Sequence, residues 1–367
     1  MGYLQNKRVF ISGVCGTIGK ELLSELTSNE NYRPVEVIGI DHNESELFFL
    51  ERAYVDDERV RLFLGDIRDP HKLQMQTQHT DVIFHTAALK HVSLCETSPT
   101  DAVQSNILGV QNLINAAQAN GVDTVIFTSS DKAVNPTNVM GTSKLMGERL
   151  ITAANNTQRG GGPVFASTRF GNVLGSRGSV IPVFRNQIAN GGPVTLTHPE
   201  MTRFIMSIRQ AADLVLNSAG LARGGEVFVT KMPVLCIQHL AEVMIEELAP
   251  KYGHNPSGIE VREIGIRPGE KLYEELMSSE ETRRTMELED YFAVLPAFRG
   301  YYKDVNYDYP GVISQAINEP YVSSMDDTMT HAEIKQFLEL HTLLDVEGAS
   351  QEGPVKQFWP GDEKRAE

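Results

Sequence analysis

Apolar runs alternate with polar, turn-forming stretches through the first 170 residues of the chain. Between the runs, apolar residues recur at helical spacing, as in 101–120, where Ala102, Leu113 and Ala116 share one face. A strand followed by a helix, repeated several times, predicts an α/β protein with a doubly wound parallel sheet. The predicted strands cover residues 8–12, 35–40, 60–64, 81–85, 124–127 and 164–169.

The pattern changes at residue 171, where glycine and polar residues become frequent. Shorter strands and helices follow, which predicts a smaller C-terminal α/β lobe that binds the substrate. We expect a nucleotide-binding domain at 5–170 with some later segments returning to it, a mainly substrate-binding lobe at 171–298, a C-terminal extension with one helix at 299–346, and a mobile tail at 347–367.

The composition is that of an ordinary soluble globular protein, with 41% hydrophobic and 22% charged residues among 367. A net charge of −15 argues against a nucleic-acid partner. Three scattered cysteines predict neither a disulfide framework nor a zinc site, and they fit a reducing cytoplasm. No signal peptide or membrane-length apolar stretch is visible, so membrane insertion is not expected. His85 and His91 lack a third ligand at metal spacing, so no metal is predicted.

A glycine-rich turn follows the first predicted strand. Gly13, Gly16 and Gly19 form G-x-x-G-x-x-G, and a helical pattern follows that begins near Thr17 and Ile18. Glycines let the main chain approach a pyrophosphate, and the helix start offers free N–H groups to it. This context predicts a Rossmann-type dinucleotide site.

Asp41 ends the second predicted strand. A carboxylate at this position binds both ribose hydroxyls of adenosine and repels a 2′-phosphate, which favours NAD over NADP. The alternative is that Asp41 only caps the next helix, which begins near Glu44. Further residues expected to line the cofactor site are Asp66 and Ile67 after the third strand, with Asp66 at the adenine edge, and the small Ala87 and Ala88 after the fourth.

A set of proton-transfer groups follows the fifth predicted strand. Ser130, Asp131 and Lys132 lie at its carboxyl end, where open α/β sheets place their ligands. Met140 and Lys144 are four residues apart, so they share one face of the next helix. Together these residues predict an acid–base site. The alternative is a polar loop with a solvated lysine.

Three arginines of the second half are candidates for binding a diphosphate: Arg177, Arg203 and Arg267. Each has an ordinary salt bridge as its alternative. Their recurrence in one predicted lobe of an acidic chain favours phosphate binding.

These motifs give the chain a long resemblance to UDP-N-acetylglucosamine 4,6-dehydratases of the extended short-chain dehydrogenase/reductase superfamily, which serve capsule, flagellin-glycan and N-glycan pathways. The resemblance covers roughly 5–295. It rests on AALKHV at 87–92, SSDKAVNPTNVMGTSK at 129–144, RFGNVLGSRGSVIPVF at 169–184, GGPVTLTHPEMTRF at 191–204 and RPGEK at 267–271.

Two positions depart from the family pattern. Met140 stands where most of the superfamily has Tyr, and a thioether cannot exchange a proton. The chain resembles a branch of these dehydratases that carries Met there and includes membrane-anchored members, and it looks like a soluble relative of that branch. That branch implies that C5 keeps its configuration. Ser93 replaces the usual Pro, a change expected to be minor.

The resemblance implies an internal redox elimination with bound NAD: oxidation at C4, loss of water across C5 and C6, and hydride return to C6. It assigns Asp131 as the acid at the C6 oxygen, Lys132 as the base at C5, and Ser130 as the partner of the 4-oxygen. Lys144 would hold the nicotinamide ribose and, without a Tyr, help to deprotonate the 4-hydroxyl. We expect the pKa of Lys132 to be lowered by burial and by a neighbouring cation, Lys144 or NAD.

The resemblance also implies a UDP-sugar substrate and a homo-oligomer. The residues it assigns to the substrate are Lys90, Asn172, Arg177, Ser179, Thr195, Arg203, Arg267 and Glu270. Three other functions stay open: a nucleotide-sugar 4-epimerase, a dehydratase that inverts C5 or uses a GDP-sugar, and a non-catalytic NAD-binding protein. The Asp131–Lys132 pair argues against the epimerase, which needs no acid–base pair for C5 and C6.

Overall fold

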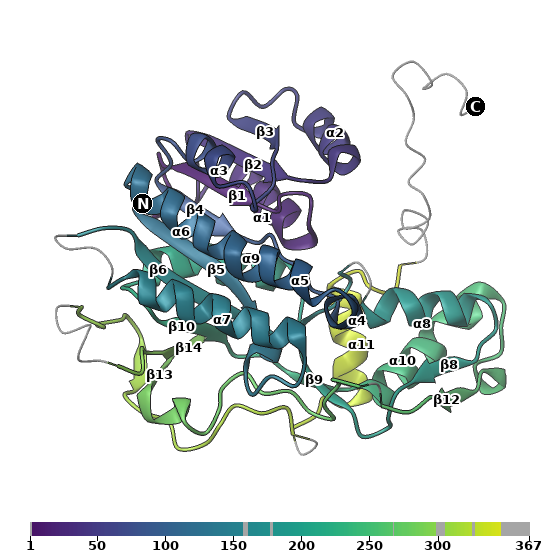
Figure 1. Cartoon of the computed structure of the whole chain (residues 1–367). Coiled ribbons are helices and arrows are strands. Elements are labelled where there is room, and N and C mark those ends of the chain that lie inside the picture. Colours follow the sequence, from purple (N-terminus) through teal and green to yellow (C-terminus); the bar gives the residue numbers. More distant parts are fainter. Residues whose placement is uncertain are drawn as a thin grey trace, which may run out of the picture.

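A ten-stranded sheet forms the centre of the molecule (Figure 1). The computed structural model describes residues 2–156, 161–176, 179–266, 268–298, 305–324 and 327–345. Seven neighbouring strands, β3, β2, β1, β4, β5, β6 and β10, run parallel. The other three strands, β14, β13 and β15, are added beyond β10 by antiparallel pairing. This confirms the predicted doubly wound parallel sheet. The order is β15 (Val312–Ser314), β13 (Thr285–Leu288), β14 (Tyr291–Val294), β10 (Val227–Thr230), β6 (Val164–Phe170), β5 (Thr124–Ser130), β4 (Val82–His85), β1 (Arg8–Ser12), β2 (Glu36–Asp41), β3 (Val60–Leu64).

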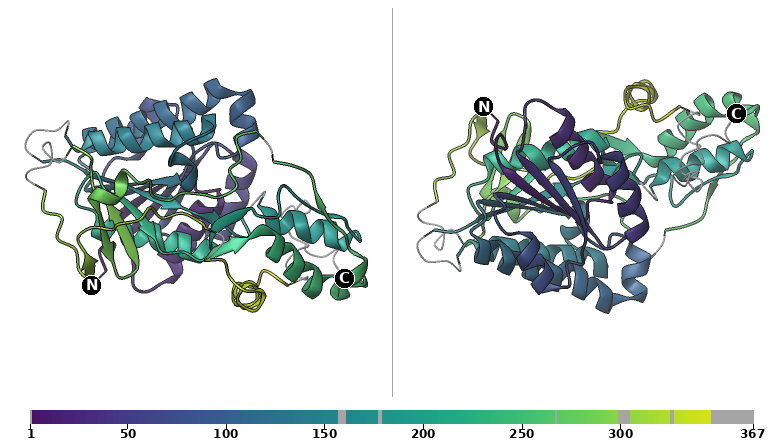
Figure 2. Two further views of the ribbon diagram at one scale, coloured as in Figure 1. Left: turned by 90° about the horizontal axis from the view of Figure 1, so that it is seen from below. Right: turned by 90° about the horizontal axis from the view of Figure 1, so that it is seen from above.

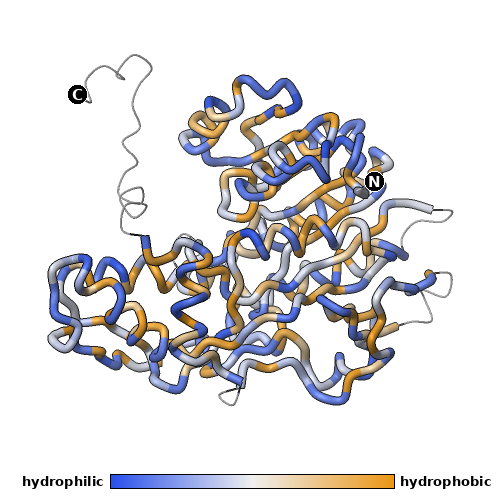
Figure 3. The backbone as a smooth tube through the Cα atoms, turned by 180° about the vertical axis from the view of Figure 1, so that it is seen from behind, coloured by the Kyte–Doolittle hydropathy of each residue, from blue (hydrophilic) through white to orange (hydrophobic). Residues whose placement is uncertain are grey.

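Helices cover both faces of this sheet, as the two views of Figure 2 show. The central strands are therefore apolar on both sides: Val9 and Ile11 of β1 join one core, whereas Phe10 joins the other. Figure 3 shows hydrophobic stretches, in orange, along the backbone of the main body. One face carries α1 (Thr17–Ser28) and α9 (Ile208–Leu221), the other carries α3 (Pro70–Gln76), α6 (Gly109–Asn120) and α7 (Val139–Ala154), and α2 (Glu44–Ala53) lies beside β3.

A smaller lobe with its own core lies beside the sheet (Figure 1). Phe184, Leu240 and Leu338 are fully or almost fully buried in it. The lobe contains α8 (Val180–Ala189), β8 (Val194–Leu196), α10 (Ile237–Leu248), β12 (Val261–Glu263) and α11 (His331–Leu340), and the strands β7 (Asn172–Val173), β9 (Thr202–Met206) and β11 (Val234–Cys236) link it to the main body.

The described part of the C-terminal extension contains the helix α11. Thr330 caps α11 and forms a reciprocal capping box with Glu333. Ile334 and Leu338 bury one face of the helix in the lobe. Within 171–298, α9, β10, β13 and β14 return to the main sheet.

The predicted helix 101–120 is interrupted. It is preceded by α4 (Val92–Thr97) and consists of α5 (Pro99–Ala102), a π-helical turn Val103–Leu108, and α6. Asn106 lies in the π-helical turn, where its side chain bonds both the N–H and the C=O of Leu89 and the hydroxyl of Ser143. The wider turn thus aims a buried amide at the loop after β4, a placement that apolar periodicity does not reveal.

Among the helices of the described residues, none has the length and apolar character that crossing a bilayer requires.

Candidate active site

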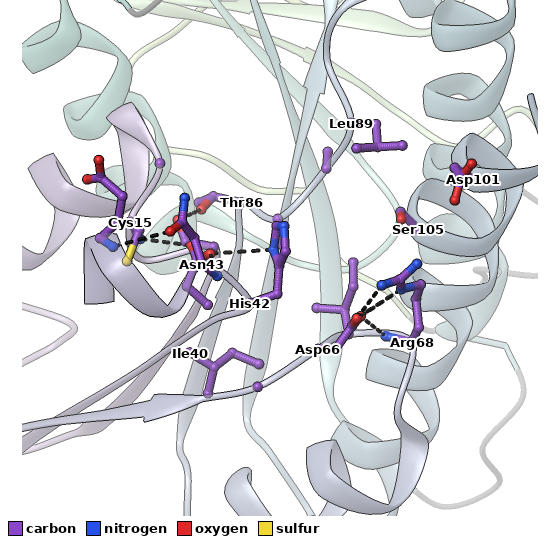
Figure 4. Close-up of a pocket in the computed structure, with 18 of the residues that line it drawn as sticks. Cys15, Ile40, His42, Asn43, Asp66, Arg68, Thr86, Leu89, Asp101 and Ser105 are labelled. Atoms are coloured by element: carbon purple, nitrogen blue, oxygen red, sulfur yellow. Dashed lines mark hydrogen bonds and ion pairs between the residues drawn. The ribbon is translucent and has the colours of Figure 1, made fainter. Parts of the chain in front are cut away.

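Two adjoining cavities open at the carboxyl ends of the parallel strands. The first, about 550 Å³, is lined by the loops after β1, β2, β3 and β4 (Figure 4). The second, about 610 Å³, is lined by the start of α1, the end of β5, one face of α7 and the segment after β6. Gly16, Thr86, Ala88 and Leu89 line both, so the two cavities form one cleft at the edge where such sheets bind ligands.

The glycine turn is built for close approach to a ligand. Gly13 has a φ of 76°, and a Cβ there would lie 2.7 Å from the Cα of Ala87. A Cβ on Gly19 would collide with the carbonyl oxygen of Gly13. Helix α1 then begins at Thr17 without a side-chain cap at Gly16, which leaves its first N–H groups free for an anion. The predicted Gly13, Gly16, Thr17, Ile18 and Gly19 all line the cleft.

Asp41 faces the first cavity and ties the glycine turn to β2. Its carboxylate accepts from the N–H of Cys15 at 3.0 Å and from the N–H of Asn43 at 2.9 Å. The side chain of Asn43, not that of Asp41, caps helix α2 by accepting from Glu46 N. The capping alternative for Asp41 is therefore wrong, and the residue lines the first cavity.

Arg68 is a cavity residue that the sequence motifs did not single out. Its guanidinium holds the Asp66 carboxylate, with Nη2 at 2.6 Å and Nε at 2.9 Å (Figure 4). This hydrogen bonding lowers the pKa of Asp66, so the carboxylate is ionised at neutral pH. The predicted Ile67, Ala87 and Ala88 line the same cavity. The two residues are close in the sequence, so their pairing could have been suspected. That the Arg68 side chain turns back to Asp66 depends on the turn after β3.

Ser130, Asp131 and Lys132 are brought together at the tip of β5. The strand extends to Ser130, whose side chain accepts from Lys132 N at the start of a 3₁₀ turn Asp131–Ala133. The Ser130 hydroxyl donates to Asp131 Oδ1 at 2.5 Å. The Lys132 ammonium lies 3.0 Å from each carboxylate oxygen of Asp131, which is 1% exposed. The Lys132 side chain is 27% exposed and is held by this ion pair, so it is not a freely solvated lysine.

The pKa of Lys132 is raised, so the expected lowering is wrong for this arrangement. Burial lowers the pKa, but the carboxylates of Asp131 and Glu274 raise it by more. Glu274 Oε1 lies 3.5 Å from the Lys132 ammonium and 3.6 Å from Arg203 Nε. Sequence reasoning missed Glu274 because it is far from Lys132 in the chain. It is also followed by Glu275, and two adjacent acidic residues are typical of an exposed surface.

Lys144 is the lysine whose pKa is lowered. It donates to the carbonyl oxygen of Thr128 at 2.9 Å and lies 4.8 Å from the ring centre of Phe127. Burial lowers its pKa to about 8. Met140, one helical turn earlier, also lines the second cavity and packs against Cys95 and Ala102. On this face of α7, Met140 offers only an apolar contact, whereas Lys144 can lose its proton at a pH of about 8.

The predicted substrate residues divide into three groups. Lys90, Asn172 and Ser179 line the second cavity. Of the described residues, Thr195, Arg203 and Glu270 do not appear in the lining of either cavity. Arg203 instead donates to the main-chain oxygens of Thr202, Lys271 and Leu272, and Thr195 bonds Gln187. Arg177 and Arg267 lie outside the described residues.

Polar atoms without partners in the described structure face the second cavity. They are Asn172 Oδ1, Ser179 Oγ and Ser129 Oγ. A buried polar atom is costly unless a ligand or water completes it, so this cavity fits a polar ligand. Ser129 precedes Ser130 at the end of β5.

The model of a family described as polysaccharide biosynthesis protein matches residues 9–296. The chain belongs to this polysaccharide biosynthesis family. The resemblance drawn from the motifs is thereby confirmed, including the extended dehydrogenase/reductase architecture.

Relatives of this chain carry names for different activities. An uncharacterized membrane protein, MJ1061 of Methanocaldococcus jannaschii, is 50% identical over 80% of this chain and 87% of its own length. The UDP-N-acetylglucosamine 4,6-dehydratase (inverting) of Campylobacter jejuni is 35% identical over 91% of this chain and 97% of its own length. The UDP-glucose 4-epimerase of Rickettsia massiliae is 36% identical over 91% of this chain and 95% of its own length. The solved structure of Pen from Bacillus thuringiensis is similar with a TM-score of 0.85, at 39% identity, and covers 94% of this chain and 100% of that chain.

Proposed function

We propose that the protein is an NAD-dependent hydro-lyase, a UDP-N-acetylglucosamine 4,6-dehydratase. The observation that carries this proposal is the buried Asp131 in double contact with Lys132 beside a dinucleotide-type cavity. An acid and a base held this closely suit the removal of a proton from C5 and of a hydroxyl from C6. The Campylobacter relative, which has this activity in its name, supports the proposal.

The first cavity and its entrance fit NAD. The uncapped start of α1 and the glycine turn suit the pyrophosphate, Asp41 suits the adenosine ribose, and Lys144 suits the nicotinamide ribose. When bound, NAD supplies the acceptor for hydride from C4 and the source of hydride for C6. The protein holds it where Thr86, Ala88 and Leu89 join the two cavities.

Asp131 and Lys132 provide both proton transfers, at C5 and at the C6 oxygen, once one proton has passed from the lysine to the aspartate. Transfer of a proton from the Lys132 ammonium to the Asp131 carboxylate yields a neutral amine and a carboxylic acid with no change in net charge. The amine then takes the C5 proton, and the acid protonates the departing C6 oxygen. The ammonium returns its proton to C5 when hydride reaches C6. At the end of turnover Lys132 is neutral and Lys144 carries the proton of the 4-hydroxyl. Loss of a proton from Lys144 and uptake of one by Lys132, both by exchange with solvent, restore the site and balance the proton that leaves in water.

Lys144 takes over the role that a phenol has elsewhere in the superfamily. Met140 cannot accept the proton of the 4-hydroxyl, whereas a lysine with a pKa of about 8 is partly neutral at physiological pH. The resemblance assigns Ser130 to the 4-oxygen, and the positions of Lys90, Asn172 and Ser179 in the lining of the second cavity support contacts of these residues with the sugar or its diphosphate. Arg177, Arg203, Arg267, Thr195 and Glu270 remain proposed UDP ligands on the strength of the resemblance.

We also propose that C5 keeps its configuration. Lys132 removes and returns the C5 proton from one face, and Met140 offers no proton on another. The inverting name of the Campylobacter relative and the epimerase name of the Rickettsia relative define the competing outcomes. A GDP-sugar substrate or loss of catalysis are further alternatives.

The decisive experiment is incubation with UDP-N-acetylglucosamine in heavy water, with the product identified by mass spectrometry and NMR. A dehydratase gives a 4-keto-6-deoxy sugar with deuterium at C5, and nuclear Overhauser contacts between the C6 methyl protons and the ring protons report the C5 configuration. Epimerisation loses no water. K132A should lose turnover while NAD stays bound, and near-normal turnover in K132A would remove Lys132 from the mechanism.

A cytoplasmic location and a homo-oligomer complete the proposal. Three buried free cysteines support a reducing compartment. Val103, Leu108 and Met146 are apolar and exposed on the helices that cover one face of the sheet, which supports pairing of two chains there. Light scattering on the purified protein measures the oligomeric state.

A further inference from the structure

A second buried carboxylate, Glu274, lies beside the proposed base. Its side chain is 2% exposed, and Oε1 lies 3.5 Å from the Lys132 ammonium. Its other oxygen, Oε2, is buried with no hydrogen-bond partner in the described structure. An unsatisfied carboxylate oxygen is costly to bury, so its retention next to a site lysine calls for a functional reason.

The main chain holds Glu274 in place from a distant segment. Ser323 is fully buried, and its hydroxyl accepts from Glu274 N at 2.8 Å while its N–H donates to Glu274 O at 2.9 Å. Thr202 in turn donates to Ser323 O at 2.6 Å. Ser323 lies beyond the 9–296 range of the family match. The position of this carboxylate therefore depends on the C-terminal extension.

The charges around Lys132 form two pairs. Asp131 and Glu274 supply the carboxylates, and Lys132 and Arg203 supply the cations. Burial and the charge of Asp131 raise the pKa of Glu274, whereas the charges of Lys132, Arg203 and Lys271 favour its ionised form. Arg203 Nε lies 3.6 Å from Glu274 Oε1. When Lys132 gives its proton to Asp131, Glu274 and Arg203 remain as a neutral pair. When Lys132 regains a proton from C5, both carboxylates are again available to stabilise the ammonium.

We infer that Glu274 is a positioning residue that fixes the Lys132 ammonium beside Asp131 and screens it from Arg203, so that Lys132 is a strong enough base for C5. This inference rests on the proposed function for its catalytic meaning. The effect of Glu274 on the protonation of Lys132 does not depend on the reaction, and it is tested without substrate.

The experiment is competitive acylation of the protein with acetic anhydride from pH 6 to 11, with labelling of each lysine read by peptide mass spectrometry. E274Q keeps the side-chain shape and removes the charge. Because one anion is lost and Arg203 is unmasked, the midpoint for Lys132 should fall by about one pH unit or more. E274D keeps the charge and should restore much of the shift.

Glu275 supplies a matched control in the adjacent position. It binds Lys271 and Asn135, away from the Lys132 ammonium. E275Q should leave the Lys132 midpoint where it is in the wild type. Equal midpoints in E274Q and the wild type would overturn the inference. If E274Q does not fold, the wild type still decides: a Lys132 midpoint at or below that of Lys144 would refute it.

Activity separates this inference from the proposed function. In E274Q the C5 exchange and elimination steps should slow while C4 oxidation, followed by absorbance of the reduced nicotinamide, continues. KM should change little, and the acid limb of the kcat profile should move with the labelling midpoint. A wild type that dehydrates no UDP-sugar would refute the proposed function, yet the labelling result would stand.

Discussion

The ammonium of Lys144 donates a hydrogen bond to the main-chain oxygen of Thr128, 2.9 Å away and sixteen residues earlier. This bond joins α7 to β5 immediately before the tip that carries Asp131. The approach is close because Gly141, one turn ahead of Lys144, leaves no room for a side chain against the carbonyl oxygen of Lys132. The helix lysine and the strand-end pair are thus parts of one rigid unit.

Substitution of Lys144 should abolish the oxidation at C4. In the wild type, burial puts the pKa of Lys144 at about 8, so the neutral amine and the oxidation rate should both increase as pH rises through 8. K144M keeps much of the volume but accepts no proton, and oxidation should fall by about 100-fold or more. Single-turnover absorbance of the reduced nicotinamide measures this step. A K144M rate that still rises through pH 8 would assign the titration to another group.

Asp131 should be needed after C4 oxidation and not for it. D131N keeps the size and the contact to Ser130 but cannot protonate the C6 oxygen, so loss of water should slow by about 100-fold or more. The 4-keto intermediate and reduced nicotinamide should accumulate, which rapid quenching and mass spectrometry detect. Slowing of both steps to the same extent would contradict the separate roles of Asp131 and Lys144.

Met140 should contribute packing and not proton transfer. It is 3% exposed and contacts Cys95 and Ala102. M140L preserves volume, so it should cost less than about 1.5 kcal/mol of folding stability and leave turnover of the same order. Thermal unfolding and steady-state kinetics check both. A large loss of turnover in a stably folded M140L would show that the thioether itself takes part.

A buried charge triad should account for much of the stability of the site. Arg169 donates to Glu148 on α7 and to Glu281, with all three side chains at most 5% exposed. R169M leaves two carboxylates buried without their partner, so the free energy of unfolding should fall by about 3–5 kcal/mol in urea titrations. R262Q breaks an exposed pair with Glu260 and is the control, with an unchanged midpoint. Equal effects of the two changes would contradict this account.

The sequence predicted the parts of the site that depend on local order. The glycine turn, Asp41 and the Ser130–Lys132 tip each follow a strand, and parallel strands bring their carboxyl ends to one edge, so their meeting was predictable. Glu274 was not, because its proximity to Lys132 arises from the packing of a distant loop held by Ser323. The raised pKa of Lys132 follows from this same contact.

The fold shows the same division. Strand ranges in the first 170 residues agree with the apolar pattern, since inner strands such as β1 are buried on both faces, although β3 at the sheet edge is exposed or half-buried along its length. The antiparallel strands β13, β14 and β15 were not predicted, because each is short and depends on pairing with a neighbour: β14 with β10, β13 with β14, and β15 with β13. The π-helical turn Val103–Leu108 was also missed, because hydrogen bonding of Asn106 and not periodicity determines it.

Glu226 should make folding stability depend on pH. Burial raises its pKa from 4.5 to about 7, although the main-chain N–H groups of Arg223 and Gly224 favour the ionised form. A carboxyl group whose folded pKa is raised stabilises the fold fully below its unfolded pKa, and this contribution is lost as pH rises through the folded pKa. The wild type should therefore lose up to roughly 3 kcal/mol between pH 4.5 and 7 from this group. E226Q resembles the protonated side chain, so its urea-unfolding free energy should change less over this range, whereas E30Q, at an exposed carboxylate, should follow the wild type. Parallel curves for E226Q and the wild type would show that Glu226 is not the group that titrates.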